Sequence, residues 1–253
     1  MTVIDVLNNN FDKIYVLTIE RLKERHALIA KNLAGLNYQL FFGVDKQTIT
    51  LQQFATEDIY NNNAYTAINN DAPKMGLGAL CCALGHVHIY KHMVANNIKT
   101  ALILEDDVVL NAINLNDVTG VFAHLPANWE LLYLGYNRNE TNGWLQKIKT
   151  ILYQLKPPHT RLNIKKQQFK KYYPSFITNN IWHSGYHDCT HAYALTLQAA
   201  QKLLVMQTPI CYKSDTLLSF AVTLNVLKGF IAKPKIFNQL STQVNSSVQS
   251  EIG

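Results

Sequence analysis

The stretch Thr-Ala-Leu-Ile-Leu-Glu-Asp-Asp-Val-Val-Leu at residues 100–110 decides the fold. Its first five residues are almost entirely apolar, which predicts a buried strand over 100–104. This strand runs directly into three adjacent carboxylates, Glu105, Asp106 and Asp107. In open α/β sheets, ligands bind outside the carboxyl ends of the strands. Three acids at such an end therefore indicate an α/β protein with a candidate binding site there.

The segments before this strand alternate between strand and helix patterns. Residues 14–19 form a β-branched and aromatic run that predicts a buried strand, and residues 38–44 predict a second one. Between them, residues 20–36 carry apolar side chains at helical spacing. Such a strand–helix–strand unit favours a parallel sheet covered by helices. Residues 76–97 predict a long helix directly before the acidic strand, whereas the Asn-rich segment 48–73 predicts only short helices and loops.

Further strands and helices are predicted after the acidic stretch. The apolar runs 129–135, 190–197 and 230–237 predict strands, the last one interrupted by a proline. Helices are predicted at 198–206 and 216–227, and the second is apolar almost throughout, which indicates burial. Hydrophobic residues make up 48% of the chain, which is enough for a packed core without disulfides. We therefore expect an α/β fold whose mixed, mostly parallel sheet has helices on both faces.

The net charge of +6 comes from one part of the chain. No acidic residue occurs between Glu140 and Asp188, and the eight cations of this stretch exceed the net charge of the whole chain. The stretch is too polar for a core and too irregular for one helix. We expect a single domain over 1–253 with a basic inserted loop or subdomain at about 141–187. The cations are Lys147, Lys149, Lys156, Arg161, Lys165, Lys166, Lys170 and Lys171.

Composition also bears on location. Residues 1–10 are polar and Asn-rich and do not look like a secretory signal, and no run approaches the ~20 apolar residues of a membrane-spanning helix. The spacing of the cysteines does not fit a zinc site and indicates free thiols in a reducing compartment. We expect a cytoplasmic protein, with a peripheral contact to the inner membrane face as an option. The cysteines are Cys81, Cys82, Cys189 and Cys211.

Three adjacent carboxylates at the end of a buried strand repel one another unless a cation joins them. Oxygen-only ligands suit Mg²⁺ or Mn²⁺, which commonly keep coordination positions for substrate phosphates. A metal there would neutralise negative charge on a nucleoside-diphosphate leaving group. The alternative interpretation is a solvated acidic loop without a function, because an acidic triplet alone is a weak motif.

The surrounding residues resemble the signature of glycosyltransferase family 25. The segment GALCCALGH at 78–86, followed by LILEDDVVL at 102–110, is similar to the family pattern G-E-I-G-C-A-L-S-H, a helix, and a hydrophobic strand into E-D-D. Residues 14–25 resemble its opening strand and R-x-x-x-R turn, and FFGVD at 41–45 resembles F-x-A-V-D-G. Later, THAYAL at 190–195 and YKSD at 212–215 are similar to the family's G-T-x-A-Y and P-x-D segments. The likeness covers most of residues 12 to 240, apart from the basic stretch.

Three departures from the family pattern stand out. Ala79 replaces the usual Glu, Gly85 replaces the usual Ser beside His86, and Lys46 follows Asp45 where Gly is usual. These changes put the identity of the donor sugar in doubt, and also the activity. A catalytically impaired sugar- or nucleotide-binding homologue is therefore the alternative to an active enzyme.

The resemblance implies a GT-A-type Rossmann-like fold that binds a nucleotide sugar, commonly UDP-galactose, with Mn²⁺ (or Mg²⁺). It implies an inverting transfer to a surface glycan such as lipopolysaccharide or lipo-oligosaccharide. Asp107 is the first candidate metal ligand and Asp106 the second. Glu105 is expected to orient the nucleotide or a neighbouring group. Arg21 and Arg25 are expected to grip its diphosphate or to stack near its base, and His86 to hydrogen-bond the donor or stabilise the acidic cluster. Solvent-facing helix cations and a structural histidine are the competing interpretations for these last three.

An inverting transfer needs a base for the acceptor hydroxyl. Asp215, which precedes a buried helix, is the leading candidate, although it or Ser214 could instead cap that helix. Asp188 is the second candidate, and the neighbouring His187 or His191 could add a metal ligand.

The basic stretch has three interpretations. It could close over the donor as a lid, hold the protein on an anionic membrane where a lipid-linked glycan acceptor is presented, or bind nucleic acid. Because no nucleic-acid-binding motif accompanies it, we expect no nucleic acid partner.

Overall fold

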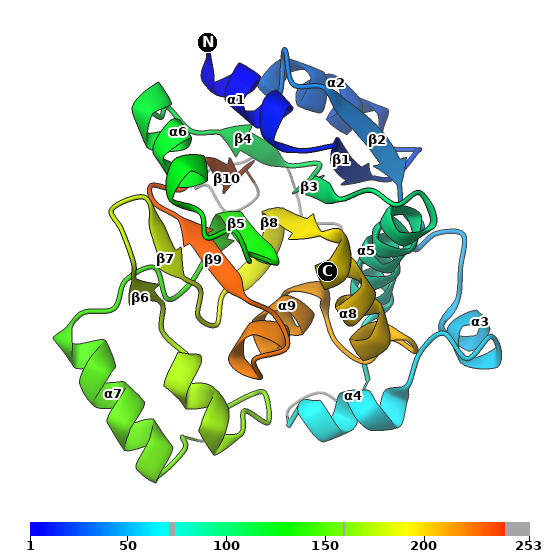
Figure 1. Ribbon diagram of the computed structural model, residues 1–253. Helices are drawn as coiled ribbons and strands as arrows, with labels where there is room; N and C mark the ends of the chain where they lie inside the picture. The colour runs from blue at the N-terminus through cyan, green and yellow to red at the C-terminus, as the bar shows by residue number, and fades with distance from the viewer. Residues whose placement is uncertain (71–73, 159, 241–253) are drawn as a thin grey trace.

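One mixed sheet forms the centre of the protein in the computed structural model, which describes residues 1–70, 74–158 and 160–240 (Figure 1). The outer strands at one side are parallel to each other, and the strands at the other side run in both directions. In spatial order the eight strands are β2 (Tyr38–Phe42), β1 (Lys13–Thr18), β3 (Thr100–Glu105), β8 (Asp188–Thr196), β5 (Leu131–Asn137), β9 (Gly229–Ala232), β7 (Ile181–His183) and β6 (Ser175–Phe176).

The sheet contains both parallel and antiparallel strand pairs. β1 is parallel to β2 and β3, and β5 is parallel to β9. β8 lies antiparallel between β3 and β5, and β6 and β7 complete the edge in antiparallel fashion. This confirms the mixed α/β fold expected from the sequence.

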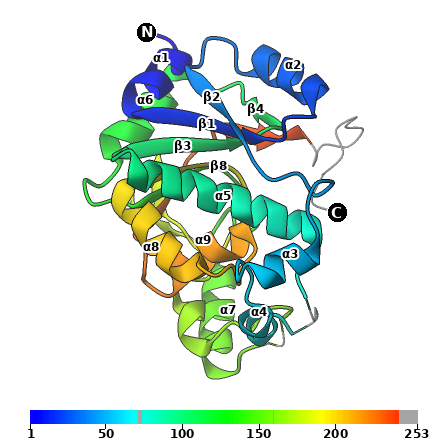
Figure 2. The ribbon, with the colours of Figure 1, turned by 90° about the vertical axis from the view of Figure 1, so that its right-hand side faces the viewer.

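Helices cover both faces of the sheet, as Figures 1 and 2 show. One face carries α1 (Val3–Asn10), α2 (Lys23–Asn32) and α6 (Leu115–His124), and the other carries α5 (Leu77–Ala95), α8 (Leu197–Gln207) and α9 (Ser214–Thr223). The short helices α3 (Leu51–Thr56) and α4 (Asn62–Ile68) lie beside α5, in the segment 48–73 that was expected to hold short helices and loops. The last three residues of that segment, 71–73, fall outside the described residues. A small second sheet pairs β4 (Val108–Leu110) with β10 (Phe237–Gln239).

Alternation along the strands gives each helical layer its own core. In β1, Ile14 and Val16 pack with α1 and α2, whereas Tyr15 and Leu17 pack with α5 and α8. β3 and β5 divide their side chains between the same two clusters. This two-sided burial is why the central strands read as continuous apolar runs rather than as alternating ones.

The basic stretch consists of two parts. It begins with α7 (Trp144–Leu155) and the 3₁₀ helix η1 (Lys166–Lys171), which pack against each other away from the central sheet. It ends with β6 and β7, which join the main sheet beside β9. The first part therefore lies apart from the central sheet, and the second part belongs to that sheet.

Outside the basic stretch, two of the described helices were not expected from the sequence. α1 lies in a segment that looked only polar, but its Thr2 and Asp5 form a reciprocal N-terminal cap and its Val6 and Leu7 are buried. α6 buries only Val118 and Val121, which is a weak periodic signal. Within the described residues, none of the helices is both long and apolar enough to cross a membrane.

Candidate active site

Several strand ends meet at one edge of the sheet. Thr18 ends β1 and Glu105 ends β3, which is parallel to it. Because β8 runs in the opposite direction, it begins at this edge, with Asp188 opposite Asn137 at the end of β5. The topology therefore collects polar residues from four strands where α/β folds bind ligands.

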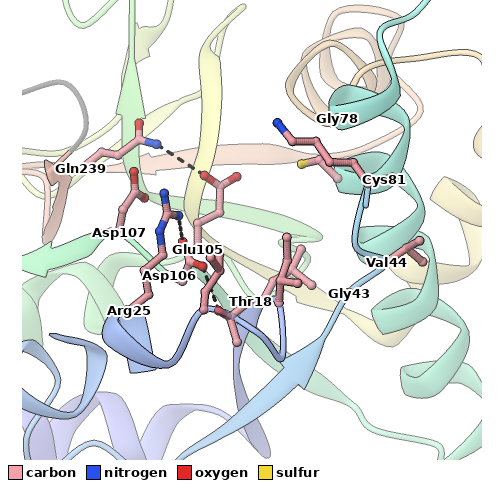
Figure 3. Close-up of a pocket in the computed structure, with 15 residues that line it drawn as sticks. Thr18, Arg25, Gly43, Val44, Gly78, Cys81, Glu105, Asp106, Asp107 and Gln239 are labelled. Carbon is pink, nitrogen blue, oxygen red and sulfur yellow. Dashed lines mark hydrogen bonds and ion pairs between the residues drawn. The ribbon is translucent and has the colours of Figure 1, made fainter. Parts of the chain in front are cut away.

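A cleft of about 690 Å³, including its open mouth, lies at this edge. Figure 3 shows its two walls: the acidic residues with Arg25 and Gln239 on one side, and helix α5 with Gly78 and Cys81 on the other. Its lining residues are Leu17, Thr18, Ile19, Leu22, Arg25, Gly43, Val44, Lys46, Gly78, Cys81, Cys82, Glu105, Asp106, Asp107 and Gln239.

Asp106 is held in place by groups of the protein. The hydroxyl of Thr18 donates a hydrogen bond to its Oδ2 at 2.8 Å, and the guanidinium of Arg25 pairs with its Oδ1. Burial raises the pKa of Asp106, and Arg25 and Thr18 oppose this rise. Arg25 therefore compensates the charge of a buried carboxylate at the wall of the cleft. The two predicted site residues Arg25 and Asp106 thus contact each other.

Glu105 is in a different environment. Thr190 donates to its Oε1 at 2.5 Å, the amide of Gln239 to its Oε2 at 3.5 Å, and His86 Nε2 lies 3.8 Å from Oε1. Burial acts to raise the pKa of Glu105, but its contacts with His86 and Thr190 outweigh burial, so the pKa lies below the usual value. Glu105 is therefore a charged group within the cleft near neutral pH.

His86 lies beneath Glu105 in a buried hydrogen-bonded chain. Its Nδ1 is 2.7 Å from the hydroxyl of Tyr193, which is 2.9 Å from the hydroxyl of Tyr90. His86 is 1% exposed, so it cannot reach a ligand in the open part of the cleft without rearrangement. In this structure it supports Glu105 rather than the mouth of the cleft.

Asp107 completes the acidic wall. It lines the cleft and is 5% exposed, and its backbone carbonyl accepts a hydrogen bond from the N–H of Leu240 at 2.8 Å. That contact continues the pairing of β4 with β10, which also brings Gln239 to the cleft. The acidic turn is thus fixed from behind by the last described strand of the chain.

Among the residues that the structure describes, one set of mixed chemistry lies close enough to hold a metal. Cys82, His86 and Glu105 place one ligand atom each within 4.8 Å of one another. Cys82 and His86 are one turn apart on α5, so both face the sheet. Burial raises the pKa of the Cys82 thiol, and the negative charge of Glu105 raises it further. Cys82 is therefore a neutral thiol, 3.6 Å from the hydroxyl of Ser214, which favours a packing role.

Arg21 is at a different place from Arg25. It forms an ion pair with Asp45, 2.5 Å between Nε and Oδ2, and does not line the cleft. Asp45 in turn accepts the backbone N–H of Gln47. This pair links the turn after β1 to the turn after β2, and it carries Lys46 into the lining of the cleft.

The two candidate bases lie near each other at the adjoining part of the edge. The Asp188 carboxylate is 3.4 Å from Arg138, and its pKa is raised mainly by burial and further by the charge of Asp215. Asp215 lies in the first turn of α9, where its Oδ1 accepts the N–H of Thr216 at 2.6 Å. The N-cap position is Lys213, so neither Asp215 nor Ser214 is the cap.

The neighbouring histidines are part of the scaffold. His187 is fully buried: its Nε2 accepts the N–H of Gly185, and its Nδ1 lies 3.0 Å from the carbonyl of Arg138. His191 is 1% exposed and packs against Gly135, where any side chain would collide with its ring. The arrangement favours packing roles for both histidines over metal binding.

Neither Ala79 nor Gly85 is among the residues that line the cleft. Ala79 is buried in an apolar cluster with Phe54, Tyr65 and Met75. A Cβ on Gly85 would meet Leu17 at 3.1 Å and Gly43 at 3.7 Å. A serine at 85 would therefore start toward Leu17 rather than toward His86, and the glycine here serves the close contact of α5 with the sheet.

Some residues of the cleft were missed from the sequence. Thr18 carried a usable signal, because it ends the first predicted strand at the edge where ligands bind. Gln239 carried none, since it reaches Glu105 through a strand pairing across more than a hundred residues of sequence. Thr190 and Cys82 lay inside motifs that were recognised without a role.

Comparison with known proteins agrees with this arrangement. The model of glycosyltransferase family 25, described as an LPS biosynthesis protein, matches residues 11–218. The chain belongs to glycosyltransferase family 25. The matched range includes every element that supplies the cleft except β10.

Individual relatives are distant and longer. A "Glycosyltransferase 25 family member" from Anopheles gambiae is 26% identical over 197 residues, 76% of this chain and 28% of its own. "Procollagen galactosyltransferase 2" from Mus musculus is 22% identical over 199 residues, 77% of this chain and 27% of its own. This family 25 chain thus spans little more than a quarter of the curated relatives it matches.

A crystal structure of mouse xyloside xylosyltransferase 1 is also similar, with a TM-score of 0.36 and 13% identity, over 85% of this chain and 62% of that chain. A likeness at this level adds nothing to the family assignment.

Proposed function

We propose that this chain is a glycosyltransferase that moves a sugar, galactose in the first instance, from a UDP-sugar to a glycan of the cell surface. The observation that carries the proposal is the acidic end of β3 in a cleft between β1, β2 and α5. Membership of family 25 and the galactosyltransferase name of a relative support the reaction class.

The donor set of the cleft fits a hard divalent cation. Its lining includes Glu105, Asp106 and Asp107 against two cations, Arg25 and Lys46, so a diphosphate would add negative charge to a wall that is already acidic. Bound Mn²⁺ or Mg²⁺ would offset that charge and stabilise the departing diphosphate. Asp107 is the proposed main ligand, with Asp106 second because Thr18 and Arg25 already engage its carboxylate.

The roles of the other wall residues follow from their contacts. Glu105, kept charged by its neighbours, is proposed to orient the donor, and His86 to hold Glu105 in position. Arg25 is proposed to face the diphosphate from beside Asp106, whereas Arg21 acts through its pair with Asp45 at the rim.

The base for the acceptor hydroxyl is proposed among Asp215 and Asp188. Both are near the cleft, since Asp215 follows Ser214, the contact of Cys82, and Asp188 begins the strand next to β3. The raised pKa of Asp188 makes it the stronger base, whereas Asp215 lies in the first turn of α9. Inversion would follow from direct displacement by a hydroxyl activated there.

The acceptor is proposed to be a lipopolysaccharide or lipo-oligosaccharide precursor, with the protein in the cytoplasm and in peripheral contact with the inner membrane face. The described residues that line the cleft include none from 141–187, which disfavours the interpretation of the basic stretch as a donor lid.

The alternative is a binding protein of the same family without turnover, suggested by Ala79 and Gly85. This alternative is disfavoured because neither residue is among those that line the cleft.

Donor hydrolysis distinguishes an active enzyme from a binding protein. It is measured with UDP-galactose, UDP-glucose and other UDP-sugars, in Mn²⁺ and in EDTA. We expect turnover that requires the metal, and a loss of at least about a hundredfold in Asp215→Asn or Asp188→Asn, whichever is the base. Tight UDP binding without turnover of any donor would favour the binding protein instead.

A further inference from the structure

The helix α7 carries its apolar side chains on the outside of the protein. Trp144 is 69% exposed, Ile151 61% and Leu155 72%. With Leu145, Ile148 and Leu152 they recur every three or four residues, so the exposed apolar residues form one continuous stripe along the helix. We call these six residues the α7 stripe. In an ordinary surface helix such a stripe faces the core.

The inward side of α7 is the polar one. Gln146, Thr150, Tyr153 and Gln154 are the half-buried residues of the helix, and no residue of α7 is fully buried. Tyr153 packs edge-on against Phe169 of η1, with ring centroids 5.3 Å apart. The orientation is thus fixed by contacts with the protein and leaves the apolar side outward.

Cations surround the α7 stripe. Lys147 and Lys149 lie on α7 itself, and Lys147 lines a recess beside the helix together with Lys170, Lys171 and Lys228. No acidic residue occurs anywhere in 141–187. An apolar stripe flanked by lysines is the pattern of helices that lie in the interface of an anionic membrane.

A second copy of the chain fits this surface less well. A helix of 12 residues is about 18 Å long, so its stripe covers far less than the roughly 800 Å² that each partner buries in a stable dimer. A symmetric pairing would also set the lysines of one copy against those of the other.

We propose that α7 docks the protein onto an anionic lipid surface, with the α7 stripe inserted at the headgroup level and the flanking lysines on lipid phosphates. This deepens the proposed function, because it gives the peripheral membrane contact a defined element.

α7 is connected through η1 to α9, the helix that carries a candidate base for the acceptor. η1 packs on α9 through Phe169 and Phe220, and Gln168 donates to Thr223 of α9 at 3.1 Å. α9 carries Asp215 in its first turn. A membrane that holds α7 would therefore be connected through two packed helices to the candidate base, which suits an acceptor presented by lipid.

Vesicle flotation tests the proposal without donor or metal, so its outcome does not depend on the proposed reaction. Phosphatidylcholine vesicles with and without phosphatidylglycerol are compared for the wild type, for the triple variant Ile151→Ser, Leu152→Ser, Leu155→Ser, and for Lys147→Gln with Lys149→Gln. The matched control is Val205→Ser, because Val205 is an 84% exposed apolar residue of α8, outside the α7 stripe.

We expect the wild type and Val205→Ser to bind only the anionic vesicles. The triple variant should bind them at least about a hundredfold more weakly, and the double lysine variant about thirtyfold more weakly, at about fivefold per lysine. All these side chains are exposed, so circular dichroism should be unchanged.

Equal vesicle binding by the triple variant would overturn the proposal. So would a wild-type dimer in sedimentation that the triple variant turns into a monomer, since the α7 stripe would then serve a second copy. Loss of vesicle binding with normal transfer to a short water-soluble acceptor would support the docking role and leave the enzymatic proposal intact.

Discussion

At the scale of single residues, three adjacent acids have three different environments. The contacts of Glu105 with His86 and Thr190 lower its pKa, burial raises the pKa of Asp106 despite Arg25, and Asp107 lines the cleft next to β10. The sequence predicts the cluster, because an apolar strand ends in it. It does not predict how the roles divide, because the partners come from β1, α2, α5 and β8 and are set by the tertiary fold.

The buried His187 should make the folded protein sensitive to acid. Its Nε2 accepts a hydrogen bond from Gly185, so the ring is neutral, and burial lowers its pKa to about 4. An unfolded histidine binds its proton near pH 6.5. As pH falls from about 6.5 to 4, the unfolded chain takes up a proton that the folded chain does not, so stability is lost over this window, by about 3 kcal/mol at most.

Urea unfolding at pH 7, 5.5 and 4.5 measures this effect. In His187→Asn the fall in unfolding free energy over the window should be smaller by up to that amount, although the variant is less stable at pH 7. The exposed His124→Asn is the matched control and should keep the wild-type slope. Part of the slope should persist in both variants, because burial also lowers the pKa of His191. An identical slope in His187→Asn would contradict the assignment.

At the scale of elements, the strands could be predicted better than their directions. The apolar runs at 14–19, 100–104 and 190–197 all proved to be central strands, as their two-sided burial requires. The antiparallel direction of β8 has no local signal, yet it brings Asp188 and Thr190 to the active edge. The amphipathic pattern of α7 was present but was hidden in a stretch judged by its charge and prolines.

Gly135 in β5 should be among the least replaceable residues of the central sheet. A Cβ there would lie 2.3 Å from Nε2 of His191 and 2.9 Å from the carbonyl oxygen of Phe237. Neither group can move freely, because His191 is buried and Phe237 pairs with Leu110. We expect Gly135→Ala to lower the unfolding free energy by about 2 kcal/mol or more.

Gly76→Ala is the matched control for that substitution, because a Cβ on Gly76 would meet nothing within 4 Å. It should cost less than about 1 kcal/mol as a change at a helix N-cap. Urea unfolding compares the two variants. An equal loss of unfolding free energy in Gly135→Ala and Gly76→Ala would show that close packing at Gly135 is not the reason for the loss.

At the scale of the whole molecule, the α/β class and the position of the candidate site could be predicted. The contacts that complete the candidate site could not. The acidic strand end and its helix lie within 30 residues of one another in sequence, so their pattern can be recognised within one short segment. The closing contacts are made by β8 and β10, from far along the chain. They depend on the order of strands in the sheet, which periodicity does not encode.

The central claim is that the acidic end of β3 holds a divalent cation that bridges the protein and a nucleoside diphosphate. Calorimetric titration of UDP with and without Mn²⁺, on the wild type and on Asp107→Asn, tests it most directly. Asp58→Asn is the matched control, since Asp58 is exposed and its positive φ suits asparagine. We predict that Mn²⁺ strengthens UDP binding at least tenfold in the wild type and in Asp58→Asn but not in Asp107→Asn, with the same unfolding transition in all three. Metal-enhanced binding of equal strength in Asp107→Asn would contradict the account.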